Sequence, residues 1–183
     1  MSIEDRCRGR DDYRALLARM WGIHAPLDAA LEATDWSGLD IDYGERSKLS
    51  WLADDLAWLG LDAAALAALP RSARLPRLAA PVDAMGALYV LEGASLGGQI
   101  IARQLKGQLG VVPGAGGTFF ASYGERIGEN WRRYLAALER FSDSPPAAAR
   151  IEAAALETFE SFLVWFGEDA EPGQAARRVA RHG

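Results

Sequence analysis

Few side chains in this sequence could bind a metal or act as a nucleophile. The 183 residues include two histidines, His24 and His182, and one cysteine, Cys7. These three form no cluster with carboxylates at the spacing that metal ligands need, so a dedicated zinc or di-iron site is not supported. Ser95 lies in a Gly-Ala-Ser-Leu-Gly segment that matches the letters of a nucleophile elbow. That motif needs a strand before the serine, whereas this segment is expected to be helical.

His24 is the best candidate for a metal ligand, but a second interpretation competes with it. It lies on the apolar face of a helix expected at residues 13–31. A lone histidine on such a face is more often a packed core residue than a ligand. His182 lies in a basic tail, and Cys7 has polar neighbours and an ordinary thiol pKa of about 8.5, which argues against a thiolate ligand. Iron ligation by His24 therefore stays open beside a structural role.

Four glycines in one expected helix are the most unusual feature of the chain. Gly86, Gly93, Gly97 and Gly98 all fall within residues 82–109. Each glycine inside a helix costs about 1 kcal/mol relative to alanine, so the four cost about 4 kcal/mol, against a net domain stability of about 5–15 kcal/mol. Their helical spacing leaves a face without side chains. Such a face could pack closely against another helix, or it could form a bare backbone surface for a planar ligand.

The elements that would position these residues are all expected to be helices. Apolar residues recur at helical spacing along most of the chain, and no segment alternates as a strand does. We expect helices at residues 13–31, 49–59, 62–69, 82–109, 123–141 and 147–166, with Pro26 breaking or kinking the first. The fold class is therefore an all-α single domain over residues 1–183, with a polar segment at 1–12 and a flexible basic tail at 167–183. The last helix carries an apolar stripe, which consists of Leu156, Phe159, Phe162, Leu163 and Phe166.

Charge and composition disfavour several classes of partner. The net charge of −5 opposes sequence-independent binding to nucleic acid and to anionic membranes. The longest apolar run, residues 84–102, is interrupted by Glu92 and the glycines, so it is no membrane span. The first twelve residues are polar and do not resemble a signal peptide. We expect a cytoplasmic protein without nucleic-acid or membrane partners.

One segment carries a resemblance to a known family. The stretch YVLEGASLGGQII, residues 89–101, is similar to the distal helix of heme oxygenases, above all the bacterial type found beside bacteriophytochromes. Further similar blocks follow in the family's order: YRALL at 13–17, GIHAPL at 22–27, Arg46-Ser-Lys48, Asp54-Asp55-Leu56, Phe119-Phe120, Tyr123-Gly124, Trp131 and the final helix up to Trp165. The resemblance covers residues 13–166, and it implies a multi-helical heme-oxygenase-like fold.

The resemblance also implies a chemistry and a set of site residues. Heme would be both cofactor and substrate, and its ring would be cleaved to biliverdin, CO and iron. The residues that the resemblance places at the heme are Gly93, Ala94, Gly97, Gly98 and Arg132. The glycine backbone would lie over the iron, Ala94 stands where many members have an aspartate, and Arg132 would pair with a propionate.

The chain departs from this family before Tyr13. The family's iron ligand is a histidine on a helix that precedes this block, but the twelve residues here contain no histidine. We therefore favour a degenerate member that binds a tetrapyrrole, heme or bilin, or a protein partner. A missing first helix would leave an apolar trough for a homodimer or a partner. The alternative is an active, biliverdin-producing heme oxygenase whose start is truncated or whose axial ligand is replaced.

Overall fold

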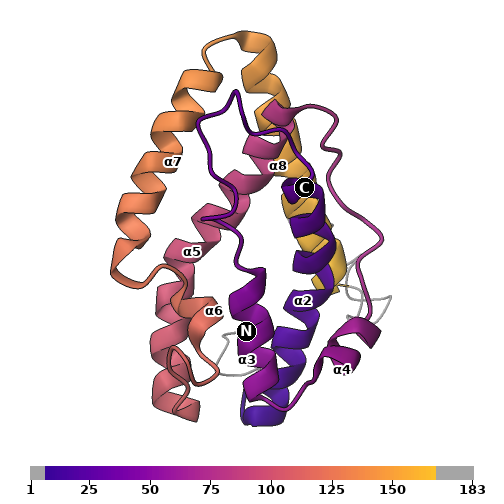
Figure 1. Ribbon diagram of the computed structural model, residues 1–183, viewed down its shortest axis with the longest axis vertical. Coiled ribbons are helices and arrows are strands. Elements are labelled where there is room, and N and C mark those ends of the chain that lie inside the picture. The colour runs from indigo at the N-terminus through magenta and orange to yellow at the C-terminus, as the bar shows by residue number, and fades with distance from the viewer. Residues whose placement is uncertain (1–6, 168–183) are drawn as a thin grey trace, which may run out of the picture.

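The computed structural model describes residues 7–167, and within that range it contains helices and no strand. Figure 1 labels the elements in chain order. They are α2 (Arg10–Glu32), α3 (Leu49–Trp58), α4 (Ala63–Ala68), α5 (Pro81–Leu109), α6 (Thr118–Ala121), the 3-10 helix η1 (Gly124–Arg126), α7 (Ile127–Phe141) and α8 (Pro145–Gly167). The expected all-α class is confirmed. The tail was expected at 167–183, but Gly167 is the last residue of α8. Residues 168–183 and the first six residues lie outside the described range.

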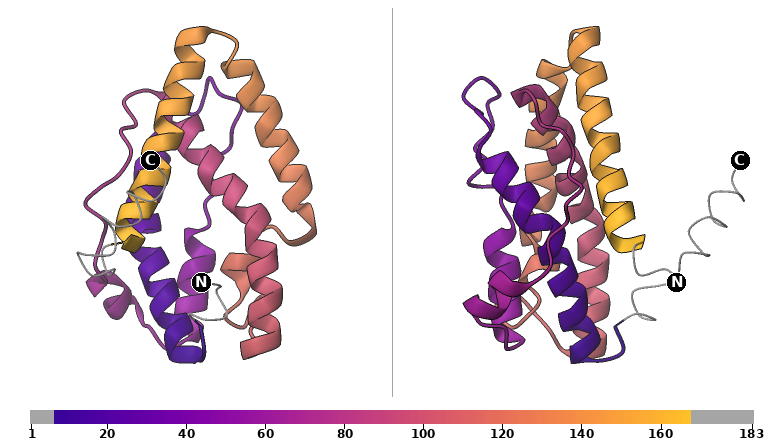
Figure 2. Two further views of the ribbon diagram at one scale, coloured as in Figure 1. Left: turned by 180° about the vertical axis from the view of Figure 1, so that it is seen from behind. Right: turned by 90° about the vertical axis from the view of Figure 1, so that its right-hand side faces the viewer.

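Helix α5 is the longest element and organises the others around it. It packs against α6, α7 and α8, while α2 packs against α3. A short turn joins α7 to α8, and the two helices diverge from it, while α8 packs against α5 at an angle that the left view of Figure 2 shows. Gly86 permits this close approach, because a Cβ there would overlap the carbonyl oxygen of Ile151 in α8. The start of α5 is also tied to α8, since Arg150 pairs with both oxygens of Asp83 at 2.8 and 2.7 Å.

Two apolar cores lie at opposite ends of the antiparallel helices α2 and α5. The first joins the C-terminal half of α2 and the N-terminal half of α5 to α7 and α8. Its largest fully buried members are Leu27, Leu31, Met85, Leu88 and Tyr134. The second joins the other halves of α2 and α5 to α3 and α6. Its largest fully buried members are Tyr13, Leu17, Leu52, Leu56 and Leu105. Each buried leucine contributes about 1.5–3 kcal/mol, so the two cores hold both ends of α2 and α5 and leave their middles available for a site.

One expectation about the first helix is wrong in part. Pro26 does not break this helix, because α2 continues to Glu32, while the alternative of a kink stays a prediction. The residues after it, Leu27 and Leu31, are fully buried in the first core, and that packing offsets the backbone hydrogen bond which proline cannot donate.

The apolar stripe of α8 does not face the core along its whole length. Leu156, Phe159 and Leu163 are exposed, the last at 72%. Helical spacing defines an apolar face but does not say what covers it. No helix in the described range is long and apolar enough to cross a membrane. The expected cytoplasmic location stays a prediction.

Candidate functional site

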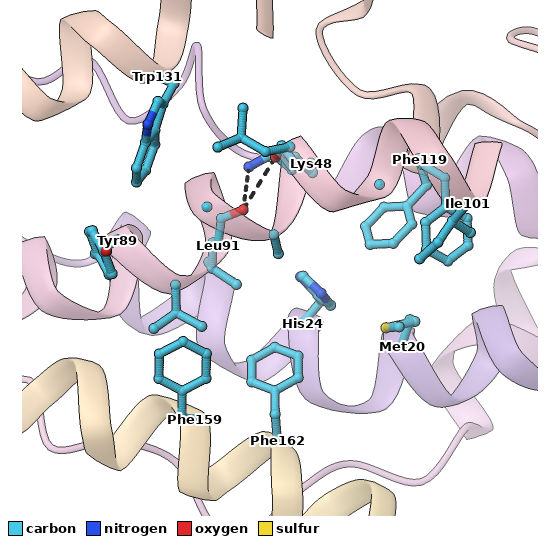
Figure 3. Close-up of a pocket in the computed structure, with 17 residues that line it drawn as sticks. Met20, His24, Lys48, Tyr89, Leu91, Ile101, Phe119, Trp131, Phe159 and Phe162 are labelled. Carbon is cyan, nitrogen blue, oxygen red and sulfur yellow. Dashed lines mark hydrogen bonds between the residues drawn. The ribbon is translucent and has the colours of Figure 1, made fainter. Parts of the chain in front are cut away.

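A cavity of about 620 Å³ lies between the two cores, and we call it the central cavity (Figure 3). The middle of α5 forms most of its wall, and α2, α6, α7 and α8 close it from other sides. Its lining consists of Met20, His24, Lys48, Tyr89, Val90, Leu91, Gly93, Ala94, Ser95, Leu96, Gly98, Ile101, Phe119, Phe120, Trp131, Phe159 and Phe162. The volume is within the range of about 300–1,000 Å³ that is typical of small-molecule and cofactor sites.

The glycines of α5 divide between helix packing and the cavity. Gly98 lines the cavity on one side, but a Cβ there would also come within 2.9 Å of the Phe120 carbonyl oxygen. Gly93 lines the cavity, and a Cβ there would meet only Trp131, at 3.7 Å. Gly97 has open space around it. The glycine face therefore divides: Gly86 and Gly98 permit close packing, as one interpretation expected, while Gly93 and Gly97 leave part of the α5 surface without side chains. The planar ligand of the second interpretation stays a prediction.

Ala94 and Gly97 lie beside one another on this wall and are both exposed. Ala94 belongs to the cavity lining, whereas Gly97 lies just outside it. The side chain of Ala94 has no hydrogen-bonding atom, so it cannot organise water as an aspartate would.

His24 projects from α2 into the central cavity (Figure 3). Its ring makes edge contacts with Phe119 and Phe162, at centroid distances of 5.2 and 5.5 Å. Burial, with a smaller contribution from the positive charge of Lys48, lowers the pKa of His24 from 6.5 to about 3. The imidazole is therefore neutral at physiological pH, which is the state that binds metals. Met20 lies one helical turn earlier and also lines the cavity.

Arg132 does not line the central cavity. It is exposed on α7, and its Nε donates a hydrogen bond to the carbonyl of Gly128 in the same helix at 3.2 Å. Its neighbour Trp131 occupies the cavity wall instead, with its ring 5.5 Å from that of Tyr89. The role of Arg132 as a propionate partner stays a prediction.

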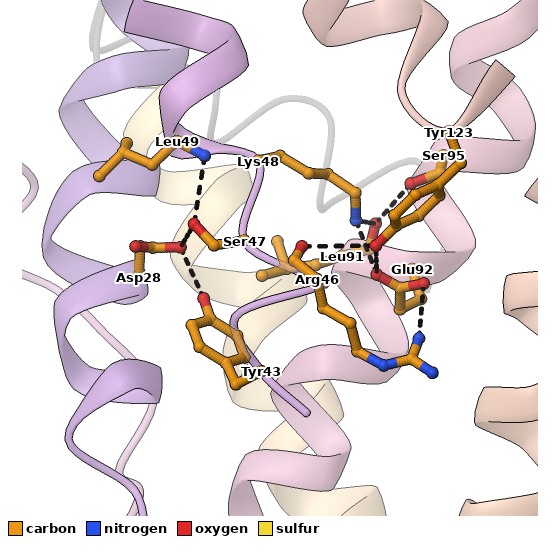
Figure 4. A network of polar contacts seen from close by, with 10 residues as sticks. All are labelled: Asp28, Tyr43, Arg46, Ser47, Lys48, Leu49, Leu91, Glu92, Ser95 and Tyr123. Carbon is orange, nitrogen blue, oxygen red and sulfur yellow. Dashed lines mark hydrogen bonds and ion pairs between the residues drawn. The ribbon is translucent and has the colours of Figure 1, made fainter. Parts of the chain in front are cut away.

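A buried network of charges joins the segment before α3 to the middle of α5 (Figure 4). Glu92 accepts hydrogen bonds from Lys48 at 2.8 Å, from Arg46 at 3.1 Å and from the hydroxyl of Tyr123 at 2.7 Å. Lys48 also donates to the carbonyl of Leu91 at 3.2 Å. Sequence reasoning gave this network no role, although the Arg-Ser-Lys block and a glutamate inside an apolar run were both visible signals.

A second set of hydrogen bonds fixes the same segment to α2. Asp28 accepts from the hydroxyl of Tyr43 at 2.6 Å and from the hydroxyl of Ser47 at 2.8 Å. Because Ser47 lies between Arg46 and Lys48, this anchor positions both cations against α5.

Sequence comparison with known proteins identifies the family of the chain. Residues 5–168 match the sequence model of the heme oxygenase family. The chain belongs to the heme oxygenase family. The "Heme oxygenase" of Xanthomonas campestris pv. campestris (strain 8004) is 31% identical over 165 residues, which cover 88% of this chain and 93% of that relative. No solved structure matches the chain.

The residues of the central cavity fit heme, the ligand that the heme oxygenase family implies. A planar ring needs a wall without protruding side chains, and Gly93 provides one inside the cavity. An iron ion needs a soft or borderline donor, and His24 is the histidine in the lining. The remaining lining is mostly aliphatic and aromatic, which suits an apolar macrocycle.

Six large apolar side chains of α5 and α8 are exposed, and we call this set the exposed apolar face: Tyr89, Leu96, Ile100, Leu156, Phe159 and Leu163. Tyr89, Leu96 and Phe159 also line the central cavity, so the cavity reaches the surface at these residues. Large exposed apolar patches usually mark binding sites.

Proposed function

We propose that this member of the heme oxygenase family binds heme in the central cavity. One observation carries the proposal. The same apolar cavity contains a part of α5 where Gly93 leaves no side chain and a histidine, His24, that is neutral. Bilins share the tetrapyrrole skeleton and are the related ligands to test. Ala94 belongs to the cavity lining and Gly97 does not. Both would extend the flat wall under the ring.

The residues would divide the work of binding. Gly93 allows the ring to approach the α5 backbone, and Trp131, Phe159 and Phe162 would contact its faces and edges. His24 would offer the lone pair of a neutral imidazole to iron. Heme, when bound, supplies a redox-active iron and a ring that can be oxidised. The apolar lining excludes water, which strengthens every electrostatic interaction inside.

Ring cleavage to biliverdin is a second candidate activity, and His24 favours it. A histidine that replaces the family's axial ligand would retain the bond that catalysis needs. A chain in which His24 only packs against Phe119 and Phe162 would bind tetrapyrrole without cleaving it. We favour binding as the conclusion, and a phytochrome-associated role stays a prediction.

A hemin titration followed by ascorbate under air tests both activities. We expect a sharp Soret band that saturates at one equivalent. His24→Ala should shift and weaken this band, whereas His182→Ala, the matched change at the second histidine, should leave it unchanged. An identical Soret band in His24→Ala would contradict ligation by His24. Appearance of a biliverdin spectrum would establish cleavage, and the absence of saturable hemin binding would overturn the proposed function.

A second function of a different class is binding of a protein, either a second copy or another chain, at the exposed apolar face. The observation that favours it is the exposure of Leu163 at 72% and Phe159 at 49%. Sedimentation velocity tests self-association. Leu163→Lys should lower the sedimentation coefficient if two copies meet there, whereas Ala136→Lys, at an exposed position of α7, should not. Monomeric wild-type protein would leave a different partner as the occupant of this face.

A further inference from the structure

The exposed apolar face consists of two helical stripes that meet at the central cavity. Residues three, four or seven positions apart share one face of a helix. On α5 this spacing joins Tyr89, Leu96 and Ile100, and on α8 it joins Leu156, Phe159 and Leu163. Tyr89, Leu96 and Phe159 line one cavity, and we call the place where they reach the surface its mouth. Because these three residues come from both helices, the mouth connects the two stripes.

Within this face, a hollow lies beside protruding side chains. The three residues of the mouth are between 38% and 49% exposed. Ile100, Leu156 and Leu163 do not line the cavity, and they are between 57% and 72% exposed. Two copies that meet around a two-fold axis bring residue i of one copy against residue j of the other, and j against i. The protruding side chains of each copy can then fill the mouth of the other, so the face is complementary to itself.

The area of the exposed apolar face is large enough for a stable contact between two copies. Six large side chains that are about half exposed leave on the order of 600 Å² of apolar surface, roughly 100 Å² each. Two copies would bury about 1,200 Å² in total, without the residues between the stripes, and stable interfaces begin at about that size. A partner that contacted one stripe alone would cover about half of this surface. The area therefore favours an occupant that spans both stripes.

The charges around the face also permit a second copy. None of the six side chains is charged, whereas a charge at the centre of a two-fold contact would lie close to its own copy and be repelled. The next residues along the two stripes are exposed charges of opposite sign, Arg103 on α5 and Glu152 on α8. A second copy can therefore cover the face without burying a charge and without surrounding it with charges of one sign.

We propose that a second copy of the chain covers the exposed apolar face, and that each copy closes the mouth of the other's central cavity. The protruding side chains of one copy contact the mouth of the other, so the partner copy supplies the part of the wall that each cavity lacks. Exchange of a ligand in the closed cavity then requires the two copies to separate. This inference names the occupant that the second proposed function leaves open. It rests on that function but not on tetrapyrrole binding.

Sedimentation velocity over a concentration series tests the dimer. Wild-type protein should change from monomer to dimer in the micromolar range, as expected for an interface near the lower size limit. Ile100→Lys and Leu156→Lys, one on each stripe, should each weaken the dimer about hundredfold, because the lysine occurs twice and each unpaired buried charge costs at least about tenfold in affinity. Leu135→Lys, the matched change at an exposed leucine of α7, should have no effect.

Two results of this experiment would overturn the inference. One is a wild type that stays monomeric well above the micromolar range, and this result requires no variant to fold. The other is a pair of stripe variants that dimerise as strongly as the wild type. A monomeric wild type still permits another chain at this face, so it would reject the inference without rejecting the second proposed function. Hemin binding is measured separately and is not affected by either result.

Paramagnetic broadening between two differently labelled copies locates the contact. One copy carries a nitroxide at Glu160→Cys, an exposed position of α8 beside the protruding residues, and Cys7 is buried away from the reagent. The other copy is wild type with ¹³C-labelled leucine methyl groups, so any broadening arises between copies. The methyl signals of Leu96, at the mouth, should broaden, and those of Leu135 on α7 should not. A mixed dimer in which the Leu96 signals stay sharp would overturn the proposed contact.

Discussion

Alanine substitutions in α5 should have opposite effects on stability at different glycines. Gly97 has open space around it, so Gly97→Ala gains helix propensity without a clash. The gain is about 1 kcal/mol, or a rise in Tm of about 3 °C for a chain of this length. Gly86→Ala gains the same propensity, but its Cβ would overlap the backbone of α8 at Ile151. Overpacking costs about 1–3 kcal/mol or more, and a backbone oxygen cannot move aside as a side chain can, so we expect a net loss of about 2 kcal/mol.

The same substitutions should separate stability from heme binding. A methyl group at Gly97 would protrude from the wall on which the ring is proposed to lie. We expect Gly97→Ala to weaken hemin binding about fivefold or more, because even 1 kcal/mol of steric cost corresponds to that factor. Gly107 offers the control, since it lies in the same helix, is exposed and has open space around it. Gly107→Ala should be as stabilising as Gly97→Ala and should leave hemin affinity unchanged.

Stability is measured by urea unfolding of the heme-free proteins, followed by circular dichroism. Binding is measured by hemin titration, followed by absorbance. Equal hemin affinities for Gly97→Ala and Gly107→Ala would refute the proposal that this face of α5 contacts the ring. A Gly86→Ala protein more stable than the wild type would refute the account of close packing against α8. The two tests are independent, because the Gly97 prediction concerns the proposed ring and the Gly86 prediction concerns the contact of α5 with α8.

Three further predictions concern the buried groups and the linkage of stability to pH. Glu92→Gln should lower the free energy of unfolding by about 3–5 kcal/mol, since it leaves Arg46 and Lys48 without their carboxylate. Glu160→Gln, which breaks an ion pair between half-exposed side chains, should cost less than about 1 kcal/mol in the same urea titration. The pKa of His24, lowered by burial to about 3, implies that between pH 6.5 and 3 the unfolded chain binds a proton that the folded chain does not. Stability should therefore fall as the pH falls through this window, by up to about 1.4 kcal/mol per pH unit. His24→Phe should reduce that slope, and an unchanged slope would show that His24 is not buried as a neutral ring.

The sequence predicted the helices well because their signals are local. The apolar periodicity and the breaks near 60, 70 and 110 locate α3, α4 and α5 to within a few residues. The glycines identified the right stretch of α5, and the apolar face of the first helix correctly placed His24 toward the interior. In each case a pattern within one helix was sufficient.

Features that depend on two or more elements could not be predicted in this way. The apolar stripe of α8 was visible in the sequence, but whether Leu163 is covered depends on what packs beside α8. The family resemblance placed Arg132 at the heme, but successive residues of a helix point in directions about 100° apart, and it is Trp131 that lines the cavity. The role of Arg132 stays a prediction. Glu92 looked like an interruption of an apolar run, because its partners Arg46 and Lys48 lie more than forty residues away.

The middle of α5 combines two costly features within a few residues. Gly93 and Gly97 weaken the helix, and Glu92 is a buried charge whose desolvation must be offset by Arg46 and Lys48. Neither feature is needed to hold the two cores together, because the leucine-rich ends of α2 and α5 do that. Residues that lower the stability of a fold without improving its packing are typical of functional sites, where they are kept because they bind a ligand. The wall without side chains and the buried charge network adjoin one cavity, so a single flat apolar ligand in that cavity would account for the position of both.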